Sequence, residues 1–406
     1  MKPRHGVRDR IGDLSTRAWG GSMVGLWIAA GAVALSLAAL GWILWTSVRI
    51  PRSIPEPDRP LFRAALEASR AELGPGVLSD AIPSGLHRHD AHVYAAFFVL
   101  FRDLCLADGL ALTRNEREIL ATSVSVSNTC HYCSHIHGAL VRAREQELVE
   151  RIFAGQPERI SDPRQRALAT YGLEARHAGA AILTAPPFTA EEASDAAIVV
   201  VSFHYINRIL DALGPRGMSR ALIVSPPRRL LASVMGLDRS IEGGIALPRL
   251  LASGLTPPIE LDASDRAHIA RWTLGRPEAA DAVAFAWSMI QHAARELFAP
   301  EVLETIRAHL AGWRGEDTDL SDPWLERAVA GLASAPHSQE LVRQALVVAR
   351  EPFRIDQGAL TRATGGDPRR RLALVAFTAC AVALRIGEWL VIPGTEGGRS
   401  SEGGRS

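Results

Sequence analysis

The stretch that decides the interpretation of this chain is Cys130-His131-Tyr132-Cys133-Ser134-His135-Ile136-His137, with Glu118 twelve residues before its first cysteine. Two cysteines three positions apart at a helix start bring their sulfurs close enough to form a disulfide with little backbone movement. Ser127, Asn128 and Thr129 are candidate N-caps, so we expect Cys130 in a first helical turn, where free amide donors lower a thiol pKa. The spacing predicts a reactive dithiol.

A histidine and a carboxylate stand at useful distances from this dithiol. His137 follows Cys133 by four residues and shares its helical face, so its imidazole can take the proton that leaves Cys133. Glu118, projected from an earlier helix, can orient that imidazole or relay the proton through water.

The order Glu, eleven residues, Cys, two residues, Cys, three residues, His resembles that of the AhpD-like alkylhydroperoxidases, members of the carboxymuconolactone decarboxylase superfamily. Glu118, Cys130, Cys133 and His137 fit it without a gap. Downstream, the stretch 203–208 (Phe-His-Tyr-Ile-Asn-Arg) resembles the aromatic-Asn-Arg segment on a late core helix of peroxidase-related members. The resemblance covers roughly residues 89–215. It implies no bound cofactor or metal and association into homo-oligomers. The all-α fold class is predicted separately, because apolar residues recur at spacings of three and four and alternating, strand-like patterns are scarce.

The resemblance also implies catalytic roles. Cys133 would attack a hydroperoxide, Cys130 would resolve the resulting sulfenic acid as a disulfide, and an external dithiol or thiol reductant would reduce that disulfide. His137 would act as the base, with Glu118 supporting the proton relay. The expected function is a thiol-dependent peroxidase or thiol-disulfide oxidoreductase with an antioxidant role.

One position departs from the family pattern. Well-studied members carry a relay histidine directly before the second cysteine, whereas this chain has Tyr132 there and His131 one position earlier. Adjacent helix positions point about 100° apart, so His131 need not take over the relay. His131, Tyr132, Tyr205 and Asn207 are therefore candidate supporting residues, and for the last two helix packing and interhelical hydrogen bonding are equally good interpretations.

Other interpretations of the cysteines carry less weight. A CxxC beside His131, His135 and His137 is also typical of half a zinc site, but no second CxxC completes a set of four ligands. Cys105 and Cys380 lie in apolar stretches, and we expect them to be small buried hydrophobes without a chemical role.

A second strong signal is an apolar run near the N-terminus. Residues 18–48 contain no Asp, Glu, Lys or Arg, and a helix needs only about 20 residues to cross a bilayer. A signal peptide has an apolar region of only about 7 to 15 residues, so we predict an uncleaved single-pass anchor at 22–48 in contact with membrane lipid. Five Lys and Arg residues precede the run and four follow closely, which favours an extracytoplasmic catalytic domain.

Composition, net charge and the positions of proline-rich segments divide the rest of the chain into domains and linkers. The chain has 406 residues, 47% of them hydrophobic, and a net charge of +1 without a basic stripe, which argues against nucleic acid as a partner. Beyond a Pro-rich linker, apolar residues recur at helical spacing. The predicted segments are a basic tail (1–21), the transmembrane helix (22–48), the linker (49–60), an AhpD-like helical domain with the CxxC (61–215), a connector (216–260), a degenerate AhpD-like domain (261–393) and a disordered tail (394–406).

The degenerate domain is predicted because part of the second half of the chain resembles part of the first half. Residues 112–119 can be laid on 298–305, which pairs Glu118 with Glu304, and Arg208 falls opposite Arg385. The positions twelve and fifteen after Glu304 are Glu316 and Asp319 rather than cysteines. We therefore expect the second repeat to be catalytically silent.

Two alternative functions remain open. A carboxymuconolactone-decarboxylase-type enzyme would use general acid and base groups on a cyclic substrate and would not need the cysteines. A non-catalytic membrane redox sensor or scaffold would use a Cys130–Cys133 disulfide only to change partner binding.

Overall fold

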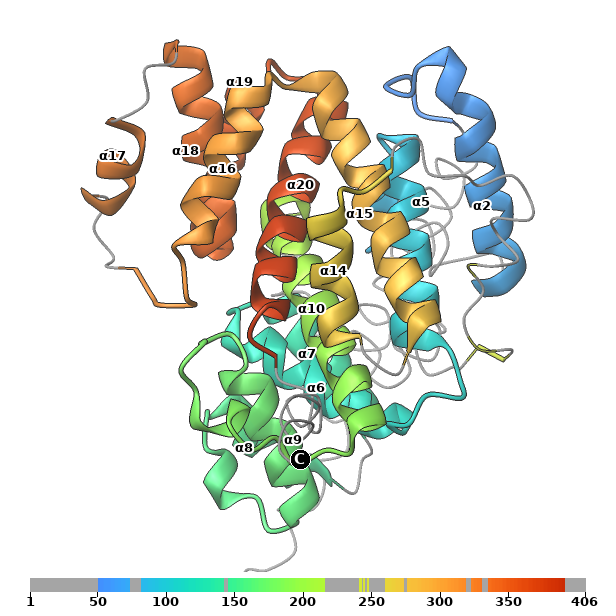
Figure 1. The fold of residues 1–406 in the computed structure, drawn as a ribbon, viewed down its shortest axis with the longest axis vertical. Helices are drawn as coiled ribbons and strands as arrows, with labels where there is room; N and C mark the ends of the chain where they lie inside the picture. The colour runs from blue at the N-terminus through green and yellow to red at the C-terminus, as the bar shows by residue number, and fades with distance from the viewer. Residues whose placement is uncertain are drawn as a thin grey trace, which may run out of the picture. The chain divides into compact units, whose positions relative to one another are not determined.

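The computed structural model describes residues 50–73, 82–141, 145–215, 241–242, 244, 247, 260–273, 276–318, 323–330 and 335–390. The predicted anchor 22–48, most of the connector and the C-terminal tail lie outside these residues, so those assignments stay predictions. Within the described residues every regular element is a helix and none is a strand, which confirms the all-α prediction (Figure 1).

The helices before the connector have these bounds: η1 Glu56–Asp58, α2 Arg59–Leu73, α4 Ser84–His87, α5 Ala91–Val99, η2 Leu100–Leu106, α6 Arg114–Ser127, α7 His131–Leu140, α8 Gln146–Phe153, η4 Pro157–Arg159, α9 Pro163–Glu174, η5 Ala181–Leu183 and α10 Ala190–Leu213. The segment η2 is a π-helical continuation of α5. The end of the predicted linker belongs to the folded part, because Ile54 is buried and α2 begins at Arg59.

The helices after the connector have these bounds: α14 Ala263–Trp272, α15 Pro277–Leu297, α16 Pro300–Ala311, α17 Pro323–Ala330, α18 Pro336–Arg350, η6 Pro352–Arg354, α19 Gln357–Ala363 and α20 Pro368–Gly387. Proline occupies an early position of many of them, where its missing N–H costs nothing.

Local sequence sets where the site-bearing helices start. Thr113 opens α6 with a capping box whose second member is Glu116. Thr189 and Glu192 form the same arrangement at the start of α10. Each box satisfies amide donors that have no partner inside the helix, so both helices begin at fixed positions.

The long apolar helix α10 lies in the middle of the hydrophobic core. It packs along α20 and against α6, while α5 packs along α15 (Figure 1). By length and composition α10 is the one described helix that could cross a membrane, but 89% of its most apolar window is buried inside the protein. We therefore treat α10 as a core helix.

Buried polar contacts join the helices before and after the connector. Arg208 of α10 donates its Nε–H to the carbonyl oxygen of Ala349 at 3.0 Å. A second contact has its donor on the later part of the chain: the indole of Trp389 donates to the carbonyl oxygen of Ala175 at 2.9 Å. Because Arg208 is fully buried, its guanidinium needs acceptors, and it finds one in Ala349 of α18 and one in the carbonyl oxygen of His204 on α10 itself.

Candidate functional site

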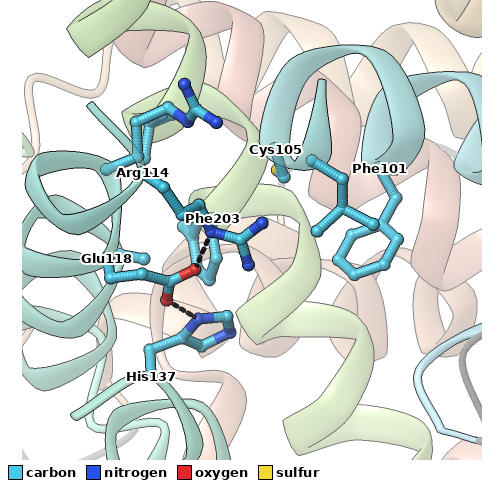
Figure 2. Close-up of a pocket in the computed structure, with 10 residues that line it drawn as sticks. Phe101, Cys105, Arg114, Glu118, His137 and Phe203 are labelled. Carbon is cyan, nitrogen blue, oxygen red and sulfur yellow. Dashed lines mark hydrogen bonds and ion pairs between the residues drawn. The ribbon is translucent and has the colours of Figure 1, made fainter. Parts of the chain in front are cut away.

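The centre of the site is an ion-paired glutamate and histidine from two consecutive helices. Glu118 on α6 accepts a hydrogen bond from His137 Nδ1 of α7 at 2.6 Å through Oε2 (Figure 2). Its other oxygen, Oε1, accepts from Arg114 Nε at 2.6 Å, one helical turn earlier. The structure thus brings together Glu118 and His137 as the sequence predicted, and it adds Arg114.

The electrostatics of this group keep the carboxylate charged. Burial alone would raise the pKa of Glu118, but the charges of Arg114 and His137 and their hydrogen bonds outweigh it and lower the pKa to about 2. The carboxylate accepts a hydrogen bond on each of its oxygens, one from each neighbour. Glu118 is therefore suited to stabilise an imidazolium at His137.

The orientation of His137 follows from its two contacts. Since Nδ1 donates to Glu118, Nε2 is the ring nitrogen that can accept a proton in the neutral imidazole. Phe203 of α10 meets the imidazole edge-on, with ring centroids 4.6 Å apart. The ring is held between α6 and α10 with its base nitrogen defined.

The turn between α6 and α7 places the first cysteine. Asn128 ends α6, Thr129 adopts a left-handed φ of 60°, and Cys130 is itself the N-cap of α7. The expectation that residues 127–129 cap the helix is therefore wrong, because those positions are used to leave the preceding helix. Asn207 of α10 holds the turn: its Oδ1 accepts from Asn128 Nδ2 at 2.9 Å, and its Nδ2 donates to Ser125 Oγ at 3.1 Å.

Both motif thiols are free, and each is only 1% exposed. The pKa of Cys130 is raised well above its ordinary value, first by burial and then by contact with Cys133 and the charge of Asp211. A hydrogen bond with the backbone of Cys133 lowers the pKa of Cys130, but by less than the other effects raise it. The expected lowering of the Cys130 pKa is wrong, because burial outweighs the helix start.

A small pocket opens beside the Glu118–His137 pair (Figure 2). Its volume is about 10 Å³, which is about the room that one water molecule needs. Neither Cys130 nor Cys133 lines it. The lining consists of Phe101, Cys105, Leu106, Arg114, Arg117, Glu118, Ala121, His137, Val199 and Phe203.

Cys105, from the π-helical segment η2, is the thiol that faces this pocket. It is buried, as expected, and burial raises its pKa to about 12. Its position opposite Glu118 and His137 was not predicted, since an apolar stretch gives no sign of which face meets another helix.

The candidate supporting residues lie in different places. His131 is exposed at the first turn of α7, whereas Tyr132 is buried, which raises the pKa of its phenol. The hydroxyl of Tyr205 donates to His87 Nε2 at 3.1 Å, outside the pocket lining. Asn207 holds the α6–α7 turn, so Tyr205 and Asn207 form the interhelical hydrogen bonds that the sequence left as one of two interpretations.

Sequence reasoning also missed residues that the fold brings to the site. Arg114 had a detectable signal, because it precedes Glu118 by four positions on a predicted helix. Asp211 had none: it lies on α10, and its negative charge contributes to the raised pKa of Cys130. Comparison of the chain with protein families, with curated proteins and with solved structures found no match.

Proposed function

We propose that this chain is a thiol-dependent peroxidase or thiol-disulfide oxidoreductase of the AhpD-like kind, which reduces hydroperoxides through Cys130 and Cys133. The observation that carries the proposal is the 2.6 Å contact between Glu118 and His137, with His137 one helical turn after Cys133. The spacing puts this carboxylate-oriented imidazole one helical turn from the Cys133 thiol on α7, and nucleophilic catalysis by cysteine requires such a neighbouring base.

The proposed reaction has two steps on the protein. His137 takes the proton of Cys133, and the thiolate attacks the hydroperoxide, which yields an alcohol or water and a sulfenic acid at Cys133. The Cys130 sulfur then attacks that sulfenic acid, forming the disulfide and releasing water. An external dithiol or thiol reductant restores the two thiols. Glu118 would stabilise His137 while it carries the proton.

The dimensions of the site favour a small substrate. The pocket beside His137 measures about 10 Å³, and the thiols are each 1% exposed. Hydrogen peroxide or a short alkyl hydroperoxide needs far less opening of the helices than a bulky lipid hydroperoxide.

The second half of the chain would be a silent repeat. Glu304, the residue paired with Glu118 in the sequence alignment, lies exposed on α16, whereas Glu118 is buried. The packing order supports duplication, because α16 contacts α18 and α20 as α6 contacts α9 and α10.

We further propose that residues 22–48 anchor the protein in a membrane, with the dithiol on the extracytoplasmic side.

Stopped-flow consumption of hydrogen peroxide by the reduced full chain tests the peroxidase proposal. We expect a burst of about one peroxide per dithiol, which Cys133→Ser abolishes and His137→Gln slows by about 10²- to 10⁴-fold. Cys380→Ser, which alters a buried thiol on α20 outside the pocket lining, is the matched control and should leave the burst unchanged. A wild type without a burst, or a Cys133→Ser variant that retains it, would refute the proposal.

The pocket lining favours one further candidate, a decarboxylase-type enzyme. Arg114, Arg117, Glu118 and His137 line the pocket without either motif cysteine, as expected for acid and base chemistry on a carboxylated ring. Because this pocket has room for only about one water molecule, the candidate requires the helices to open around the ring. It predicts activity on a cyclic lactone carboxylate that survives replacement of both motif cysteines by serine and is lost in Glu118→Gln.

A further inference from the structure

A second, larger cavity opens in the later half of the chain. Helices α14, α15, α16 and α20 line it, and α14 packs against both α15 and α20 (Figure 1). None of the residues assigned to the dithiol chemistry is among its lining residues. Its volume is about 190 Å³. A cavity of about 150 Å³ holds a benzene molecule, so this one has room for a ligand slightly larger than benzene.

One wall of the cavity is a guanidinium held against aromatic rings. Arg307 of α16 lies over the indole of Trp287, 5.1 Å from the ring centroid, and over the ring of Phe377 at 5.7 Å. Stacking of this kind restrains the side chain but leaves its N–H groups available to other partners. Among the described residues Arg307 donates no hydrogen bond, and its side chain is 36% exposed. A planar fork of unused donors is the group that binds a carboxylate through two parallel hydrogen bonds.

A carboxylate stands beside this guanidinium. Asp265 of α14 accepts through Oδ2 from the indole of Trp287 at 2.7 Å and from Gln291 Nε2 at 2.9 Å. The same oxygen is 3.7 Å from Arg307 Nη2, which is too long for a hydrogen bond. Within the described part of the chain, the other oxygen, Oδ1, accepts no hydrogen bond. Asp265 is therefore held in place and keeps an acceptor for a ligand.

The remaining polar groups leave the cavity without a net charge. Arg385 of α20 and Glu388 form an ion pair with each other. His268 lies with Nε2 3.3 Å from a backbone carbonyl oxygen, and burial lowers its pKa, so it is neutral at pH 7. Two cations thus face two carboxylates, and leucine and alanine side chains form the rest of the lining. A ligand with a single charge meets both attraction and repulsion there, whereas a zwitterion can pair with both signs.

The cavity lies at helix positions that are filled differently in the first half of the chain. In the alignment of the two halves, the lining residues Ala311 and Leu384 correspond to Ser125 and Asn207. Ser125 and Asn207 are hydrogen-bonded to each other at 3.1 Å and hold the turn that leads to Cys130. Under the proposed duplication, the second half has an open cavity with charged walls where the first half has that turn.

We propose that this cavity binds a small zwitterion, an α-amino acid with an apolar side chain, independently of the dithiol chemistry. The carboxylate of the ligand accepts from the Arg307 guanidinium, and its ammonium group donates to Asp265 Oδ1. The two charges of an amino acid are neighbours, as are the two protein groups that receive them. The leucine and alanine side chains of the lining then cover an aliphatic side chain of the size of valine or leucine.

Isothermal titration calorimetry of the purified full chain with L-leucine, L-valine and L-alanine at pH 7 tests the proposal. Two analogues of leucine each lack one charge: isocaproate has no ammonium group, and isoamylamine has no carboxylate. We expect a single site per chain with a dissociation constant below about 1 mM for the best amino acid, and at least about 10-fold weaker binding of each analogue. No saturable binding by any of the three amino acids, or isocaproate that binds as well as leucine, would overturn the proposal.

Substitution of the two charged groups locates the site. Arg307→Gln and Asp265→Asn should each weaken amino-acid binding by about 10- to 100-fold. The matched controls make the same changes in charge on exposed side chains outside the cavity lining, Arg266→Gln on α14 and Asp281→Asn on α15, and should leave the affinity unchanged. Wild-type affinity in Arg307→Gln, or equal weakening in the controls, would show that the ligand does not bind here.

A further variant blocks the cavity without removing a charge. Ala311, the last residue of α16, is exposed and lines the cavity, so Ala311→Phe adds a ring there without disturbing the core. It should abolish binding and keep the urea midpoint of the wild type, which decides the proposal even where a charge variant fails to fold. Wild-type affinity in Ala311→Phe would refute it. None of these variants alters the dithiol, so the peroxide burst should not change, and the two proposals can fail separately.

Discussion

Replacing Glu118 by glutamine should destabilise the fold by an amount that depends on pH. The pKa of Glu118 is lowered from 4.5 to about 2 in the folded protein. At about 1.4 kcal/mol per pKa unit, this difference corresponds to about 3 kcal/mol of stability at pH 7. Because the folded-state pKa is the lower one, the contribution is complete above about pH 4.5 and is lost as the pH falls through about 2.

Equilibrium urea unfolding of the full chain, followed by tryptophan fluorescence, measures this contribution. The difference between wild type and Glu118→Gln should be about 3 kcal/mol at pH 7 and pH 5, and about 1 kcal/mol smaller at pH 3.5.

The matched control is Glu147→Gln. Glu147 pairs with Arg151 across one helical turn, as Arg114 pairs with Glu118, but its side chain is 75% exposed. Its loss should change the stability by less than about 0.5 kcal/mol at every pH. Equal effects of the two substitutions, or a Glu118→Gln effect that is the same at pH 7 and pH 3.5, would refute the electrostatic argument.

Three substitutions away from the thiols test the packing that positions them. Gly172→Ala would place a Cβ 2.6 Å from Ser123 Cβ between α9 and α6, so we expect a loss of about 1–3 kcal/mol, seen as a lower thermal midpoint. Tyr205→Phe leaves His87 Nε2 buried without a donor and should cost about 1–3 kcal/mol in urea unfolding, with peroxide consumption unchanged. Asn207→Ala frees the α6–α7 turn and should slow disulfide closure as well as destabilise the fold; unchanged closure would contradict its positioning role.

Local features of the fold were readable from the sequence because neighbouring residues create them. The capping box at Thr189 needs only four consecutive residues, a Thr followed three positions later by a Glu. The contact of Glu118 with His137 was also within reach, since both lie close in the chain on consecutive amphipathic helices.

What the sequence left out depends on contacts between distant segments. The burial of Cys130, and with it the raised pKa of its thiol, depends on how distant helices meet around the start of α7. No periodicity specifies that meeting. The same holds for Cys105, whose place opposite Glu118 depends on how η2 packs against α10 and α15.

The burial of α10 under α20 has a consequence for the newly made chain. A ribosome completes α10 at Leu213 and reaches the start of α20 at Pro368 only later. At about 5–20 residues per second, that interval is on the order of ten seconds. Throughout it, a helix with the length and composition of a membrane span has not yet received its main cover. Until then the nascent chain exposes an apolar segment of membrane-spanning length, and the later helices bury it in the core.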